Sequence, residues 1–377
     1  FQTSGNWIYS RYFPMPGETM AQSIRREVLA VRNHLGCVDM STLGKVDAKG
    51  KDALTFLSRI YCNNIDSIQP GKLRYALMLR EDGILFDDGT VAQLGEQHFL
   101  VTMTTANAGA CWRWMQKLLQ VQWPELDVQI TSVTDHWASL AISGPESRKL
   151  LAELKPSFEI DKENFPFASV REGLLDSTIP CRIFSVSFSG ELSYEINVPA
   201  AYASVLFDWV LELGKAFSMT PYGLETLDVL RIEKGHLSIG TEIDGRTTPA
   251  DLGLGKMVSS KKNFIGQALL QRPVLQQSIR AQLVGLIAAD GLSVIPPAAV
   301  ITENKWQPGE PQDTVGKITA AVESPILGYS IALALIDNGF QRIGQRLWAV
   351  SAINNQAVEV VVTASCFYDQ NGSRSHA

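Results

Sequence analysis

Apolar and polar residues alternate along several stretches of the chain, and each of these stretches predicts a β-strand with one buried face. Residues 75–79 predict one strand, Asp82–Gly83 a two-residue turn, and residues 84–91 the returning strand of a hairpin. A second pair of strands is predicted from residue 179 to Pro199, with its turn at Gly190–Glu191. Strands joined by such short turns are antiparallel neighbours.

Two segments between these strands have the spacing of helices. Residues 111–119 are rich in aromatic and apolar side chains and predict one helix. Thr220–Pro221 predicts the start of another, with the threonine as N-cap and the proline at the first helical position, and Gly235 predicts its end. Leucines at every third position between them supply the stripe that this helix buries.

Beyond residue 275 the pattern changes to short strands, which predicts a separate β-barrel or sandwich. The predicted strands are residues 282–287, 316–322, 331–336 and, with breaks, 347–362. We place the boundary near residue 275. It divides the chain into a region of two lobes at residues 1–275 and a C-terminal β-barrel at residues 276–377.

The composition is that of a folded protein. Hydrophobic residues make up 45% of the 377 residues and charged residues 19%. A net charge of −6 offers no broad basic surface for nucleic acid. No run of about 18 apolar residues predicts a membrane-spanning helix, and the first residues have neither the basic nor the apolar region of a signal peptide. We therefore expect no nucleic-acid or membrane partner.

The cysteines and histidines predict neither disulfides nor a metal site. The 5 cysteines are widely spaced and form no Cys-x-x-Cys pair, and the 5 histidines are equally scattered. Reduced thiols are typical of the cytoplasm. We therefore expect a cytoplasmic protein without a bound metal.

Asp88 is the first candidate for chemistry. Strand parity assigns Ile84, Phe86 and Asp88 to one face of the returning strand. The two-residue turn places Asp88 opposite Leu77 and diagonal to Tyr75. A carboxylate on such an apolar face is costly unless something meets it there. The alternative is a wet strand end, where Asp88 only solvates a turn.

Glu195 and Arg231 are weaker candidates. Glu195 lies on the strand face opposite to Tyr194 and Ile196, and a lone glutamate on a polar face is usually solvated. Arg231 comes late in a predicted helix, where an arginine commonly complements the helix dipole or pairs with a residue such as Glu233. Neither residue alone indicates a site.

No nucleotide-binding motif is found in the sequence. Residues 253–258 begin like a dinucleotide fingerprint, but Val258 stands where the third glycine belongs and no strand precedes the segment. Gly255–Lys256 lacks the upstream glycine and the following hydroxyl residue of a P-loop, and no Gly-x-Ser-x-Gly occurs. The chain thus offers no recognisable redox-dinucleotide site of its own.

Ten short motifs point to one family. In chain order they are REVLAVRNH (26–34), VDMSTLGK (38–45), YALMLREDG (75–83), TSVT (131–134), SFSGE (187–191), TPYG (220–223), VLRIEKG (229–235), TPADLGL (248–254), SPILG (324–328) and IALA (331–334). Together they resemble sarcosine oxidase α subunits, in the superfamily of the glycine-cleavage T-protein and other aminomethyltransferases. The resemblance is specific because it covers nearly the whole chain in one order.

This resemblance implies a fold and a set of site residues. The fold is α+β, with two α/β folate-binding lobes around a central channel and a C-terminal β-barrel. Asp88 matches the catalytic carboxylate, Tyr75 a tyrosine beside the pterin, Glu195 the residue that holds the pterin, and Arg231 a folate-site arginine. Two features depart from the family: Ser193 replaces a more usual glycine, and the dinucleotide-binding half of the α subunits has no counterpart in the sequence.

The implied activity is that of an enzyme unit that binds tetrahydrofolate. A carboxylate such as Glu195 can accept both N–H donors on the pyrimidine edge of a pterin. Asp88 is suited to take or relay the proton of folate N10 and to stabilise a cationic one-carbon unit. The expected product is 5,10-methylenetetrahydrofolate, made from an iminium or formaldehyde that amine demethylation supplies.

Partners follow from the same resemblance. Flavin, as FAD or FMN, is expected on a flavoprotein subunit of a hetero-oligomer, because the chain has no dinucleotide site of its own. Two alternatives stay open. One is a self-contained aminomethyltransferase or demethylase, and the other is a folate-binding assembly module that has lost turnover.

Overall fold

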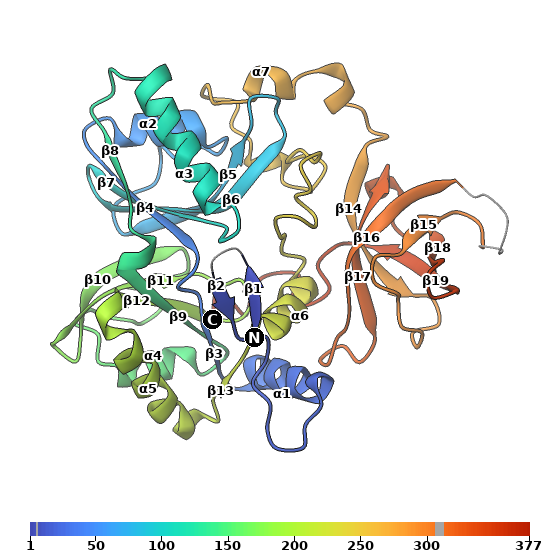
Figure 1. Ribbon diagram of the computed structural model, residues 1–377, viewed down its shortest axis with the longest axis horizontal. Helices are drawn as coiled ribbons and strands as arrows, with labels where there is room; N and C mark the ends of the chain where they lie inside the picture. The colour runs from blue at the N-terminus through green and yellow to red at the C-terminus, as the bar shows by residue number, and fades with distance from the viewer. Residues whose placement is uncertain (5–6, 306–312) are drawn as a thin grey trace.

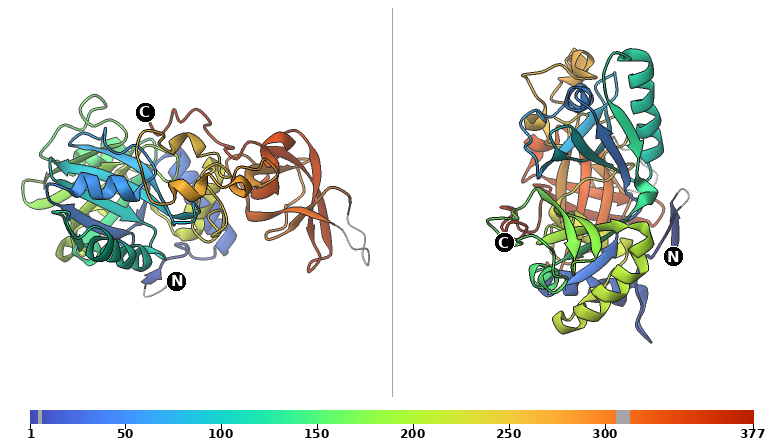
Figure 2. Two further views of the ribbon diagram at one scale, coloured as in Figure 1. Left: turned by 90° about the horizontal axis from the view of Figure 1, so that it is seen from above. Right: turned by 90° about the vertical axis from the view of Figure 1, so that its left-hand side faces the viewer.

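The structure is a computed structural model that describes residues 1–4, 7–305 and 313–377. Two lobes share one eleven-stranded sheet, and a closed barrel lies beside them (Figure 1). Seen from above, the barrel projects from one end of the molecule (Figure 2). This arrangement confirms the predicted α+β fold class and the C-terminal barrel.

The large sheet runs through both lobes. In spatial order its strands are β13 (Thr220–Pro221), β3 (Gly36–Asp39), β9 (Trp137–Ser143), β12 (Ser193–Pro199), β11 (Ile179–Ser185), β10 (Ser169–Leu175), β5 (Lys72–Leu79), β6 (Leu85–Gly95), β7 (His98–Met103), β4 (Gly44–Lys49) and β8 (Gln129–Ser132). The pairing of Ser169 with Lys72 joins β10 of one lobe to β5 of the other. The two lobes therefore meet at the pair of neighbouring strands with the fewest paired residues in the sheet.

Helices pack against this sheet and beside it. They are α1 (Met20–Asn33), α2 (Ala53–Ile60), α3 (Ala108–Lys117), α4 (Ser147–Glu153), α5 (Ala203–Gly214), α6 (Leu224–Lys234) and α7 (Gln267–Leu270). In Figure 1, α2 and α3 lie on the upper lobe and α4 and α5 on the lower one. A small hairpin of β1 (Gln2–Ser4) and β2 (Trp7–Tyr9) precedes them.

The structure corrects the predicted start of α6. Thr220–Pro221 is not the helix N-terminus, because these residues form β13 and pair in parallel with Gly36–Cys37 of β3. The helix begins at Leu224, and Gly223 is its N-cap. The predicted end is confirmed, since Gly235 has a φ of +75° and adopts the left-handed conformation that closes many helices.

The β5–β6 hairpin differs from its prediction in the turn but not at Asp88. Leu79 pairs with Leu85, so residues 81–83 form the loop in place of the predicted two-residue turn. A bulge at Phe86 then absorbs the extra loop residue. The predicted pairing of Asp88 with Leu77 is thereby restored.

The same bulge reverses the predicted facing of Phe86. Leu85 packs in one cluster with Leu77 and so shares the face of Asp88. Phe86 packs in another cluster with Met78, on the other face. Simple alternation therefore assigned Phe86 to the wrong face, because the extra residue shifts the strand parity by one.

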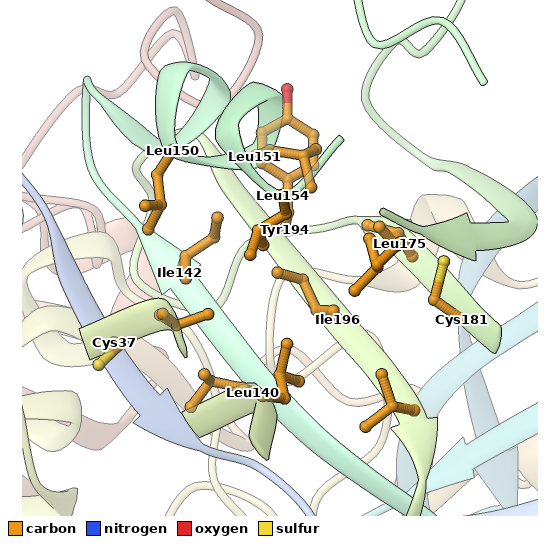
Figure 3. Packing of buried hydrophobic residues seen from close by; sticks show 14 of the residues in the cluster. Cys37, Leu140, Ile142, Leu150, Leu151, Leu154, Leu175, Cys181, Tyr194 and Ile196 are labelled. Carbon is orange, nitrogen blue, oxygen red and sulfur yellow. The ribbon is translucent and has the colours of Figure 1, made fainter. Parts of the chain in front are cut away.

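Strand β12 separates an apolar face from Glu195, as its alternation predicts. Tyr194 and Ile196 have no exposed surface and pack with Leu140 and Ile142 of β9. Figure 3 shows these side chains on one side of the sheet, beneath the helix that carries Leu150. Glu195 points to the opposite face, where its cross-strand neighbours are Phe184 and Ala141.

The barrel closes on itself and then sends the chain back to the lobes. Its strands, in order, are β14 (Ala281–Ala288), β17 (Ser330–Asp337), β16 (Thr314–Glu323), β15 (Val300–Thr302), β18 (Arg346–Ser351) and β19 (Gln356–Thr363). After β19, the Tyr368 N–H donates to the Glu233 carbonyl of α6 at 2.9 Å. Within the described part of the chain, no helix has the length and apolar character needed to span a membrane.

Candidate functional site

Asp88 and Tyr75 lie together on the β5–β6 hairpin. The Tyr75 hydroxyl donates to Asp88 Oδ2 at 2.6 Å. The other carboxylate oxygen, Oδ1, accepts the hydroxyl of Thr104 at 3.2 Å. Both oxygens of Asp88 therefore have a donor, which argues against a carboxylate that only solvates a strand end.

Burial affects the protonation of both groups. It raises the pKa of Asp88 above its usual value, and the hydrogen bonds from Tyr75 and Thr104 oppose this shift. Burial and then the charge of Asp88 raise the pKa of Tyr75 well above 10.0, so Tyr75 stays a hydrogen-bond donor. Tyr75 nevertheless keeps 36% of its surface exposed, so a ligand can reach its side chain although protein atoms surround it closely.

Asp87, the neighbour of Asp88, is more deeply buried. It is only 1% exposed and accepts the Thr104 N–H at 3.2 Å and the Asn107 side-chain amide at 3.4 Å. Burial and then the charge of Asp88 raise the pKa of Asp87 to about 7. Asp87 is less accessible than Asp88, so Asp88 is the carboxylate that a ligand can meet.

Glu195 is a half-buried carboxylate whose oxygens accept no hydrogen bond from the described residues. Burial raises its pKa to about 7, and the positive charge of Lys45 opposes that shift. An unpartnered carboxylate in such surroundings is costly unless a ligand supplies donors. Its position is therefore suited to binding a group with N–H donors.

Lys45, which the sequence analysis did not single out, is the cation that interacts with Glu195. It is 2% exposed and donates to the carbonyls of Ser41 and Leu43 at 2.9 and 3.1 Å. Burial lowers the pKa of Lys45 to about 8, while Glu195 and then Asp39 raise it. The sequence signal that could have identified Lys45 is its place in the motif at residues 38–45. It was not used because a lysine on a strand is ordinarily exposed to solvent.

The loop between β3 and β4 links the surroundings of Glu195 to those of Asp88. Its carbonyls hold Lys45, and the hydroxyl of Thr42 in the same loop lies 3.0 Å from that of Thr105. Thr105 directly follows Thr104, which bonds Asp88. The structure thus connects two of the predicted site residues through a single loop.

Arg231 lies in a different network. Its Nε donates to Asp228 at 2.6 Å and its Nη1 to Glu242 at 2.7 Å. The expected alternative partner, Glu233, is instead bound by Arg32 at 2.6 Å. Among the described residues, Lys45 and not Arg231 is the cation that acts on the charge of Glu195. Arg231 therefore makes no hydrogen bond or ion pair with Glu195 within the described part of the chain.

Two cavities of about 410 Å³ lie away from these residues, and one of them is lined partly by charged side chains such as Asp244, Arg280 and Lys317. The other is lined by uncharged residues of the 249–276 segment, and neither lining includes Asp88 or Glu195. No group of three or more histidine, cysteine or acidic side chains is placed to hold a metal ion within residues 1–4, 7–305 and 313–377. The Asp88 and Glu195 neighbourhoods are the candidate site.

Comparison with protein families gives two matches that together cover most of the sequence. Residues 1–262 match the GCVT N-terminal domain. Residues 282–369 match the glycine cleavage T-protein C-terminal barrel domain. The second match falls on the closed barrel of the structure.

The curated relatives include sarcosine oxidase α subunits and aminomethyltransferases. The sarcosine oxidase subunit alpha of Rhizobium meliloti is 42% identical over 379 residues, which are 100% of this chain but 38% of that protein. The aminomethyltransferase of Caldanaerobacter subterraneus is 30% identical over 353 residues, 93% of this chain and 89% of that protein. The chain thus spans about two fifths of the length of the α subunits and nearly all of the aminomethyltransferase.

A solved structure shares the fold. The glycine cleavage system aminomethyltransferase T from Bartonella henselae superimposes with a TM-score of 0.80, over 92% of this chain and 90% of that one, at 23% identity. At this identity the similarity establishes the architecture alone. The two lobes and the barrel are therefore a shared fold.

Proposed function

This chain belongs to the glycine cleavage T-protein family, whose enzymes transfer one-carbon units to tetrahydrofolate, and we propose that it forms 5,10-methylenetetrahydrofolate within a sarcosine oxidase-like complex. Its one-carbon substrate is the iminium or formaldehyde that amine demethylation releases. The observation that carries this proposal is the Asp88 carboxylate, held by Tyr75 and Thr104 on the strand hairpin. The folate would supply N5 and N10 as the nucleophiles.

Glu195 is the proposed pterin-binding residue. A carboxylate can accept two adjacent N–H donors at once, and Glu195 has no donor of its own among the described residues. Lys45 favours the ionised form of Glu195, which is the form that accepts both donors. Tyr75, beside Asp88, is the proposed neighbour of the pterin ring.

Asp88 is the proposed catalytic residue. Joining the one-carbon unit to the second folate nitrogen requires N10 to lose its proton, and an ionised Asp88 within reach can accept it. The same negative charge stabilises a cationic one-carbon unit. Holding both reactants in one site also raises the rate, because the reaction is then effectively intramolecular.

Arg231 is kept as a proposed folate-site residue on the resemblance alone. Arg231 is 2% exposed, and its guanidinium already donates to Asp228 and Glu242. A direct contact with folate would use the remaining edge of the guanidinium. The division near residue 275, with folate bound by residues 1–275, belongs to the same proposal and is supported by the start of the barrel at Ala281.

Flavin is proposed to reside on a partner flavoprotein subunit of a hetero-oligomer. The relative that is 42% identical is named as a subunit, and residues 253–258 of this chain lack the third glycine of a dinucleotide fingerprint. We place the complex in the cytoplasm, since the 5 cysteines are free thiols. Neither nucleic acid nor membrane is a proposed partner.

A stand-alone aminomethyltransferase is the second candidate. An aminomethyltransferase that matches over 93% of this chain and 89% of its own length supports this candidate. A folate-binding module without turnover is the third. It is disfavoured because Asp88 keeps two hydrogen-bond donors.

One experiment separates these candidates. The natively purified protein is examined for co-purifying flavoprotein by its absorbance spectrum and subunit pattern, and is titrated with tetrahydrofolate while tryptophan fluorescence is followed. A flavoprotein partner with folate binding supports the first candidate, and turnover by the chain alone supports the second. Absence of any folate binding contradicts all three.

A further inference from the structure

Thr104 contacts both carboxylates of the Asp87–Asp88 pair, although the two side chains lie on opposite faces of β6. Its backbone N–H donates to Asp87 Oδ2 and its hydroxyl to Asp88 Oδ1, each at 3.2 Å. The other oxygen of Asp88 accepts from Tyr75 at 2.6 Å. Donors from two different segments, one on each oxygen, restrict rotation of the Asp88 carboxylate.

Asp87 stabilises the turn that contains Thr104. Besides the Thr104 N–H, it accepts the side-chain amide of Asn107, which also donates to the Phe86 carbonyl at 2.8 Å. Thr104 directly follows β7, and Asn107 directly precedes α3. The turn between these elements is therefore fastened to β6 at both of its ends.

Gly89 permits this close approach of β6 and β7. A Cβ atom at Gly89 would lie 2.0 Å from the Thr102 carbonyl oxygen, so any other residue would push the strands apart. Beside it, the Thr90 N–H donates to the Thr102 hydroxyl at 2.9 Å. The end of β7, and Thr104 after it, is thereby held against the acidic pair.

We propose that Thr104 is a positioning residue for Asp88, and that Asp87 acts through Thr104 and not on the substrate. The inference rests on the proposed one-carbon transfer, in which Asp88 is the catalytic group. It adds two residues that the resemblance does not assign. The Thr104 hydroxyl favours the ionised form of Asp88, and the contact of Asp87 with Thr104 helps to keep that carboxylate aimed in one direction.

The titratable groups around Asp88 agree with this division of roles. Burial raises the pKa of Tyr75, Tyr61 and Cys111, so none of these groups carries a charge near pH 7. Among the described residues, Asp87 is the other titratable neighbour of Asp88 that can carry a charge near pH 7, because its pKa is raised to about 7. Both carboxyls accept hydrogen bonds that favour their ionised forms, and Asp88 is the one that also has an accessible neighbour, Tyr75.

The test uses Thr104→Val in the full protein, with Thr104→Ser as the matched control. Valine keeps the side-chain shape and the N–H bond to Asp87 but removes the hydroxyl from Asp88. We expect the transfer kcat to fall about 10- to 100-fold, the effect of one hydrogen bond to a charged group. The tetrahydrofolate Kd should stay unchanged, and serine should restore kcat.

A second measurement follows Asp88 itself. The carboxyl carbon of ¹³C-labelled aspartate is titrated by NMR, with the Asp88 signal assigned through Asp88→Asn. Thr104→Val should raise the pKa of Asp88, because a donor to its ionised form is lost, and Thr104→Ser should leave it unchanged. The proposal is overturned if Thr104→Val leaves both this pKa and kcat at their original values, or if it weakens folate binding as much as kcat.

Asp87→Asn tests the second step. If Asp87 acts through Thr104, the double variant with Thr104→Val should lose little more kcat than the worse single variant. Fully multiplicative losses would contradict that step. Failure of the proposed function would be seen separately, in the unmodified protein. That protein would neither bind tetrahydrofolate nor form product faster than the uncatalysed reaction with formaldehyde. The NMR titration of Asp88 is independent of this outcome because it requires no turnover.

Discussion

Tyr75 donates its hydroxyl to Asp88 at 2.6 Å, although the strand register sets Tyr75 opposite Thr90 and Asp88 opposite Leu77. The contact is therefore the diagonal one that long side chains make across an antiparallel pair. It joins the carboxylate proposed for proton transfer to the tyrosine proposed to lie beside the pterin. The residues proposed for substrate binding and for chemistry thus lie on one hairpin.

The first prediction concerns the catalytic role of Asp88. Asp88→Asn keeps the size of the side chain but removes the proton acceptor, so folate affinity should be nearly unchanged while transfer falls on the order of 10²–10⁴-fold. In the assembled complex, amine oxidation should continue with formaldehyde released in place of 5,10-methylenetetrahydrofolate. The measurement is the ratio of these products at saturating folate, read early because the two also condense in solution.

Asp208→Asn is the matched control for this experiment. Asp208 is an exposed residue of α5, and the same amide substitution there should leave the product ratio unchanged. An unaltered ratio in Asp88→Asn would remove Asp88 from the reaction.

The second prediction concerns Glu195 as the pterin-binding residue. Glu195→Gln replaces an acceptor of two hydrogen bonds with a group that also donates, so tetrahydrofolate binding should weaken by about 1.5–3 kcal/mol. Quenching of tryptophan fluorescence measures the affinity. Glu153→Gln, at an exposed position of α4, should bind folate normally. Equal affinity in both variants would exclude Glu195 from the site.

The third prediction is a folate affinity with a maximum between about pH 7 and pH 8. Burial raises the pKa of Glu195 to about 7 and lowers that of Lys45 to about 8. The ionised carboxylate binds the pterin donors, so affinity should rise as pH increases through 7. It should fall again as Lys45 loses its proton and no longer favours that ionised form.

Two variants separate the limbs of this pH profile. Glu195→Gln should abolish the rise on the acidic side, and Lys45→Met should abolish the fall on the alkaline side. Isothermal titration in buffers of different ionisation enthalpy should also detect proton uptake or release on binding. An affinity that does not change from pH 6 to pH 9 would contradict the assignment of both residues.

The fourth prediction concerns the ionic network of Arg231. Arg231→Met leaves the fully buried carboxylate of Glu242 without its cation, and breaking such a pair costs about 3–5 kcal/mol. Denaturant unfolding should show this loss of stability. Folate affinity, measured below the unfolding transition, tests the proposed contact: a normal Kd would leave Arg231 with a structural role only.

Features that depend on local periodicity were predicted well. Glu195 faces away from Tyr194 because successive strand residues alternate, and this holds in any register of β12. The left-handed end of α6 at Gly235 likewise depends on a residue that has no Cβ. The terminal barrel followed from a run of short strands.

Features that depend on distant segments were not predicted. Thr220–Pro221 has the local chemistry of a helix start, but pairing with β3 placed it in the sheet. The bulge at Phe86 placed that side chain on the opposite face of β6 from the one predicted. Which face it packs against depends on the segments that cover the two faces of β6. Lys45 was missed because its burial and the charge of Glu195 on the distant strand β12 act on it only in the folded sheet.

By itself the sequence determined the family, the α+β class and the types of group at the site, because motifs and strand alternation are properties of neighbouring residues. Only the tertiary structure decided which charges meet. It let the charge of Lys45 act on Glu195, paired Arg231 with Glu242, and brought the Thr104 hydroxyl to Asp88. The physical reason is that a buried charge is stabilised by partners within a few ångströms, and those partners come from strands and loops that only the folded sheet brings together.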